Sequence, residues 1–130
     1  MPNLKYSALV DSLLIAVPEI KRRYDALQSE IGPDVLPYPV FELVLEPVVK
    51  SALTANADDD LSRRVFAFLE EMARAQDIEV VNLLAVGIFE PWVADPGTLG
   101  RAWKYMGEST KKLASDTAHR LKRSDTLPRY

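Results

Sequence analysis

The chain has 130 residues and a formal net charge of −3, and 48% of its residues are hydrophobic. This length is that of one ordinary domain, and the composition is that of a globular rather than a disordered protein. The absence of cysteine excludes disulfides, thiolate metal sites and cysteine nucleophiles, and the presence of one histidine excludes metal sites that need several.

Apolar residues recur at helical spacing along most of the chain, and polar or proline-containing turns separate the periodic segments. The predicted helices span residues 9–17, 19–31, 40–55, 61–75, 80 to about 91, 99–106 and 110–121. The segment that starts at Val80 is also rich in strand-forming residues, but its length and the absence of flanking strands favour a helix.

Prolines and polar caps set the predicted boundaries. Pro47 and Pro91 lack a backbone donor, so we expect a kink, a break or an end of the helix at each. Asp77, Thr98 and Ser109 are predicted N-caps, because short polar side chains can accept hydrogen bonds from the first helical N–H groups.

The fold class predicted from these elements is all-α, an irregular bundle of about six or seven helices stacked as antiparallel hairpins. A HEAT-like array is the variant, and the lack of a clean internal repeat makes it the weaker one. We expect one helical domain over residues 1–123 and a frayed tail over 124–130. No stretch resembles a signal peptide or a membrane span, so we expect a cytoplasmic protein without a membrane partner.

Charge is distributed unevenly along the chain. Residues 1–100 contain 16 acidic and 8 basic side chains, a balance of −8, whereas residues 101–130 contain 3 acidic and 8 basic side chains, a balance of +5. The acidic part favours cationic partners and disfavours direct binding of nucleic acid. The basic end suits the negative C-terminal pole of the last helix.

Several carboxylates stand out as candidate binding residues. Glu42 and Glu46 lie four residues apart and therefore share a helix face, where they could bind a divalent metal, transfer protons or simply be solvated. A metal would need further ligands, so we predict no metal site. Asp58, Asp59 and Asp60 precede a helix, where negative charge suits the helix dipole.

Glu90-Pro91-Trp92, together with Trp103 and Tyr105, forms the most unusual cluster. Aromatic side chains beside acidic ones are good anchors for a partner. The alternative is that both tryptophans seal the core between the last helices. Glu90 could then accept a hydrogen bond from the Trp103 indole, cap a neighbouring helix end, or pair with an arginine such as Arg101.

Motifs of the common enzyme classes are missing. No serine lies in a Gly-x-Ser-x-Gly elbow, and the segment 97–100 is too short for a phosphate loop and lacks its lysine. We therefore predict a protein that is not an enzyme and has no cofactor.

The segments 65–73, 77–86, 88–90 and 105–111, with the opening segments 9–13 and 18–19, resemble one group of bacterial proteins. Its members are small, all-helical, largely uncharacterised cytoplasmic proteins, some of them encoded beside polymorphic toxins as presumed immunity proteins. Asn82, Glu90 and Gly107 match the family pattern. The resemblance weakens after Ala114.

The resemblance implies an immunity protein that neutralises a cognate toxin by occluding its active site, and an acidic surface would steer a basic toxin towards it. The residues expected to contact the partner are Glu42, Glu46, Asp58, Asp59, Asp60, Glu90 and Trp92. One alternative is a helical adaptor that holds a peptide or subunit in a groove near Trp92 and Trp103. A carboxylate-dependent enzyme around Glu90 is another.

Overall fold

The computed structural model describes residues 3–55 and 59–128, and these residues form an all-α bundle of seven continuous helical segments without a strand. The predicted fold class is confirmed. Short 3-10 turns lead into the first two helices. In chain order the elements are η1 (Tyr6–Ala8), α1 (Leu9–Ala16), η2 (Pro18–Ile20), α2 (Lys21–Ile31), α3 (Pro37–Val40), η3 (Phe41–Leu45), α4 (Glu46–Ala55), α5 (Asp59–Ala73), α6 (Ile78–Leu84), η4 (Ala85–Phe89), α7 (Glu90–Val93), α8 (Pro96–Trp103), α9 (Glu108–Arg120) and η5 (Ser124–Thr126).

Two of the segments are long helices that pass through a π turn. The helix α3–η3–α4 and the helix α6–η4–α7 both continue through a proline at which we expected a kink, a break or an end. The N–H group of Glu46 bonds to the carbonyl of Phe41, and that of Glu90 bonds to the carbonyl of Ala85. These bonds to the fifth preceding residue widen the helix just before Pro47 and Pro91, where the proline ring would clash with a regular α-helical carbonyl.

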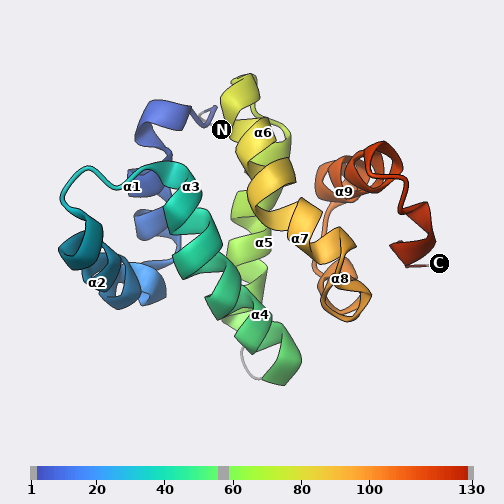
Figure 1. Ribbon diagram of the computed structural model, residues 1–130, viewed down its shortest axis with the longest axis horizontal. Helices are drawn as coiled ribbons and strands as arrows, with labels where there is room; N and C mark the ends of the chain where they lie inside the picture. Colours follow the sequence, from blue (N-terminus) through green and yellow to red (C-terminus); the bar gives the residue numbers. More distant parts are fainter. Residues whose placement is uncertain (1–2, 56–58, 129–130) are drawn as a thin grey trace.

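The core forms around α5, which contacts α1, α4, α6 and α9. Figure 1 shows α3–α4 and α6–α7 side by side across α5, with α1 and α2 at one end and α8 and α9 at the other. The largest fully buried side chains are Trp92, Phe41, Phe66 and Phe89. Phe41 lies on the helix α3–η3–α4, Phe66 lies on α5, and Phe89 and Trp92 lie on the helix α6–η4–α7. The core therefore joins both long helices to α5.

Several predicted boundaries need correction. Asp77 caps α6 as predicted. However, the N-cap of α8 is Asp95 and not Thr98, because Asp95 accepts hydrogen bonds from both the N–H and the hydroxyl of Thr98. The last helix begins at Glu108, one residue before the predicted Ser109 cap.

The C-terminal segment also differs from the expected frayed tail. Residues Ser124–Thr126 form a 3-10 turn, Thr126 is buried and Leu127 packs against the core. Residues 129 and 130 lie outside the described residues. None of the helices in the described ranges combines the length and the apolar character that a membrane crossing requires.

Candidate functional site

Four of the predicted binding residues, Glu42, Glu46, Glu90 and Trp92, lie on the two long helices. Glu42 and Glu46 belong to η3 and α4, and Glu90 begins α7. The helices approach closely at Gly87, where a Cβ atom would lie 3.9 Å from the Cβ of Phe41 and 4.0 Å from the Cγ of Glu42. A single methyl group at position 87 would make ordinary van der Waals contacts there, whereas a longer side chain would meet Phe41 and the stem of Glu42.

Trp92 is part of the core and not a surface anchor. Its side chain is 1% exposed, and its ring centroid lies 6.0 Å from those of Phe66 and Phe89. The indole Nε1 donates a hydrogen bond to Oε2 of Glu46 at 3.0 Å. The prediction that Trp92 contacts a partner is therefore wrong. The core alternative holds for this tryptophan because the bundle supplies an acceptor for its one polar atom.

Glu90 pairs with the basic C-terminal part of the chain. Nη2 of Arg120 donates to Oε2 of Glu90 at 2.9 Å. The partner is thus an arginine, as one of the alternatives expected, but it is Arg120 rather than Arg101, the example named. Trp103 is instead half-buried, with Nζ of Lys111 5.5 Å from its ring centroid. Glu46 and Glu90 thus already hold internal partners, which leaves them less available to a second protein.

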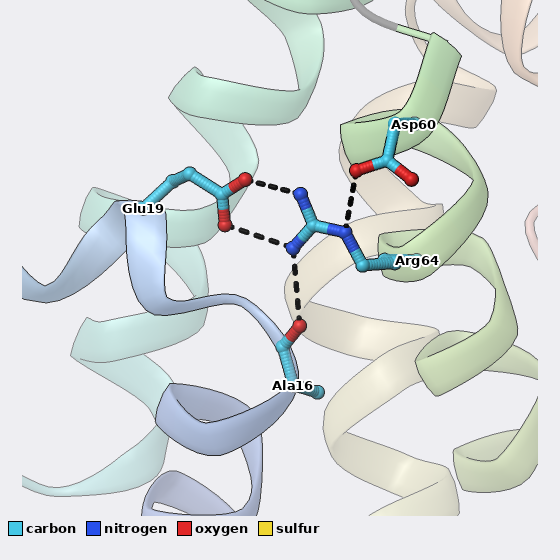
Figure 2. Close-up of polar contacts among 4 residues, drawn as sticks. All are labelled: Ala16, Glu19, Asp60 and Arg64. Atoms are coloured by element: carbon cyan, nitrogen blue, oxygen red, sulfur yellow. Dashed lines mark hydrogen bonds and ion pairs between the residues drawn. The ribbon is translucent and has the colours of Figure 1, made fainter.

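Asp60 belongs to a separate cluster around Arg64 (Figure 2). The guanidinium of Arg64 donates to Asp60, to both oxygens of Glu19 and to the carbonyl of Ala16, so it ties η2 and the end of α1 to α5. The hydrogen bonds from Arg64 lower the pKa of Glu19 to about 2 and raise the pKa of Arg64. Asp59 is the first residue of α5, and Asp58 lies outside the described residues.

Glu70 is a structural carboxylate that the sequence analysis missed. From α5, it accepts hydrogen bonds from the N–H groups of Ser109 and Thr110 and from the Thr110 hydroxyl, each at 2.9 Å. It therefore caps α9 from another helix. Burial alone would raise the pKa of Glu70, but these hydrogen bonds outweigh it and lower the pKa.

The same contact explains why a glycine stands at position 107. A Cβ atom at this position would lie 2.7 Å from Cδ and Oε1 of Glu70, so no larger residue fits without displacing the cap. The sequence singles out Gly107 as a residue of the family pattern, and the structure gives it this packing role.

Glu42 and Glu79 are exposed carboxylates of the two long helices. Within the described part of the chain, neither side chain takes part in a hydrogen bond or an ion pair. The two long helices also expose Leu43 to 59% and Val86 to 41%. We call the set Glu42, Leu43, Glu79, Asn82 and Val86 the two-helix face; all five side chains are exposed.

An open cleft of about 460 Å³ lies elsewhere, between α5 and the segment that connects α8 to α9. Arg63 and Lys104 line it together with aromatic and small residues. Among the described residues, no three His, Asp or Glu side chains come close enough together to hold a metal ion.

Comparison with known proteins assigns the chain to a family. A family model described as a domain of unknown function, DUF7674, matches residues 10–121. The chain belongs to this family. The match includes both long helices, the Arg64 cluster and the Glu70 cap. No significant match was found among curated proteins or among solved structures.

Proposed function

We propose that the chain is a non-enzymatic, cytoplasmic protein-binding module, an immunity protein that occludes the active site of a cognate basic toxin. The observation that supports this best is the two-helix face. It combines carboxylates that have no internal cation with exposed aliphatic side chains, on two helices held at a fixed spacing.

The physical reason is that each component of this face serves a different step of binding. Free carboxylates raise the association rate of a cationic partner, and aliphatic contacts at the centre slow its release. Glu46 and Glu90 border the face, but they serve mainly to hold Trp92 and Arg120. Of the residues predicted from the sequence, Glu42 is therefore the one we retain as a principal contact, and Glu79 joins it.

The adaptor alternative loses its main support, because Trp92 is buried. The proposal of an enzyme around Glu90 rests on a carboxylate that is ion-paired with Arg120. We therefore keep toxin binding as the proposed function.

The test uses any toxin domain that is found encoded next to this gene. We expect a stable complex whose association rate falls as salt increases, because screening weakens steering. The double variant Glu42→Lys and Glu79→Lys should lower the association constant at least tenfold and abolish protection of cells that express the toxin.

The matched control reverses two exposed carboxylates elsewhere, Glu30→Lys and Asp34→Lys, and changes the net charge equally. It should retain protection. Absence of a complex would overturn the proposal, and an equal loss in both double variants would show that the two-helix face is not the contact surface.

A further inference from the structure

The cleft beside α5 has features of a small-molecule site that are independent of the two-helix face. Its α5 side is formed by Arg63, Phe66, Ala67 and Glu70, and its other side by Lys104, Tyr105 and Gly107. None of these residues lies on α3–α4 or α6–α7.

The cleft is hollow because its centre is formed by residues with little or no side chain. Arg63, Ala67 and Glu70 follow one another at spacings of four and three, so they form one stripe of α5. Ala67 is the exposed middle of that stripe. Gly107 faces it across the cleft and cannot carry a Cβ because the Glu70 carboxylate occupies that space.

The charge available to a ligand in the cleft is positive. Arg63 and Lys104 come from separate elements and line the same space. The negative charge of Glu70 is directed at the N-terminus of α9, where three hydrogen bonds engage it. No carboxylate side chain that the structure describes pairs with Arg63, and its planar guanidinium has the geometry to hold a carboxylate or phosphate.

One wall of the cleft is aromatic. The rings of Phe66 and Tyr105 stack with centroids 5.7 Å apart and planes 18° apart, and Nζ of Lys104 lies 5.1 Å from the Tyr105 centroid. Phe66 is buried and fixes the ring of Tyr105, which is half-exposed. A flat apolar group could lie along this wall while its anionic end meets Arg63.

We propose that this cleft binds a small organic anion, a carboxylate or phosphate attached to a flat apolar group. Arg63 and Lys104 hold the anion, Tyr105 contacts the apolar part, and the small side chain of Ala67 leaves space between them. The proposal does not depend on toxin binding, since it involves another surface and another class of ligand.

The experiment titrates the ¹⁵N-labelled full chain with phenyl phosphate, benzoate and neutral benzyl alcohol, and follows the amide signals of Ala67, Tyr105 and Gly107. We expect saturable shifts with at least one of the two anions and none with benzyl alcohol. Phenyl phosphate alone would identify a phosphate site, and benzoate alone a carboxylate site. Inorganic phosphate should bind at least fivefold more weakly than phenyl phosphate if the latter binds.

Two variants and two controls test the residues. Arg63→Gln and Ala67→Leu should each weaken binding at least tenfold, the first by removing the cation and the second by filling the cleft. Both positions are exposed, so the variants should keep the wild-type circular dichroism spectrum. Arg74→Gln and Ala26→Leu, at exposed positions outside the cleft, should bind as the wild type does. Saturable binding by neither anion, equal shifts with benzyl alcohol, or unchanged binding by Arg63→Gln would overturn the proposal.

Discussion

The contact between Glu70 and the start of α9 makes a quantitative prediction about stability. Replacing Glu70 by alanine removes three hydrogen bonds at the N-terminus of a 13-residue helix. Loss of a good N-cap costs about 1–2 kcal/mol, and a charged acceptor adds to this. The Thr110 hydroxyl keeps its hydrogen bond to the Gly107 carbonyl at 3.1 Å, so it is not left without a partner. We therefore expect a total loss of about 2–3 kcal/mol in the free energy of unfolding.

This loss converts into a measurable shift of the melting temperature. With an unfolding entropy of about 2.1 cal/mol/K per residue, a loss of this size lowers Tm by roughly 7–11 °C for this chain. Glu71→Ala is the matched control, because Glu71 is the next residue of α5 and has no hydrogen bond or ion pair in the described structure. Its free energy of unfolding should change by less than about 0.5 kcal/mol.

The pH dependence provides a second readout of the same contact. The pKa of Glu70 in the folded chain lies below its ordinary value of 4.5. Its contribution is therefore complete above that pH and is lost as the pH falls through the native pKa. Urea unfolding of the wild type and of Glu70→Ala should show a stability difference that shrinks in acid. Equal stabilities of Glu70→Ala and Glu71→Ala at pH 7 would refute the capping role.

Three further predictions concern the core and the Arg64 cluster. Glu19→Gln should lower the urea midpoint at neutral pH, and this difference should shrink as the pH falls from 4.5 through 2, since the pKa of Glu19 in the folded chain is about 2; a difference that is as large at pH 2 as at pH 7 would contradict the ion pair. Gly87→Ala should change the unfolding free energy by less than about 1 kcal/mol, because its Cβ would meet its nearest neighbour, the end of the Leu83 side chain, at 3.4 Å and Phe41 and Glu42 at 3.9 and 4.0 Å, all ordinary contacts, whereas Gly87→Leu should lose about 1–3 kcal/mol by separating the long helices. Equal effects of the two substitutions would argue against close packing there. Trp103→Phe leaves Trp92 as the remaining tryptophan, and its emission should be blue-shifted and protected from iodide; quenching like that of free tryptophan would show that Trp92 is exposed.

The helices could be predicted from the sequence because their signals are local. Apolar spacing at three and four residues indicates α5, and Asp77 indicates the start of α6. The two π turns precede similar short sequences, and this similarity indicates that the two long helices share a local structure. Residues 45–49 (Leu-Glu-Pro-Val-Val) and 89–93 (Phe-Glu-Pro-Trp-Val) share a Glu-Pro pair followed by apolar residues, and each pair follows a π turn.

The hydrogen-bond and ion-pair partners of the carboxylates could not be predicted from local sequence signals. Each partner is distant in the sequence: hydrogen bonds join Glu46 to Trp92, 46 residues away, Glu70 to Thr110, 40 residues away, and Glu90 to Arg120, 30 residues away. The neighbouring residues in a sequence do not distinguish a solvated carboxylate from one that caps a distant helix. For this reason the role of Glu70 was missed, and the sequence left open whether Trp92 lies in the core or at the surface.

By itself, the sequence determined the all-helical class, the approximate positions of the helices and the separation of an acidic body from a basic end, because each follows from neighbouring residues or from composition. Only the tertiary structure decided which charges remain available to a ligand. Packing of the two long helices directs Glu46 into the core and leaves Glu42 exposed, and docking of α9 on α5 engages Glu70 and opens a cationic cleft beside it. The availability of a charge depends on its spatial neighbours, and those are set by how distant helices pack.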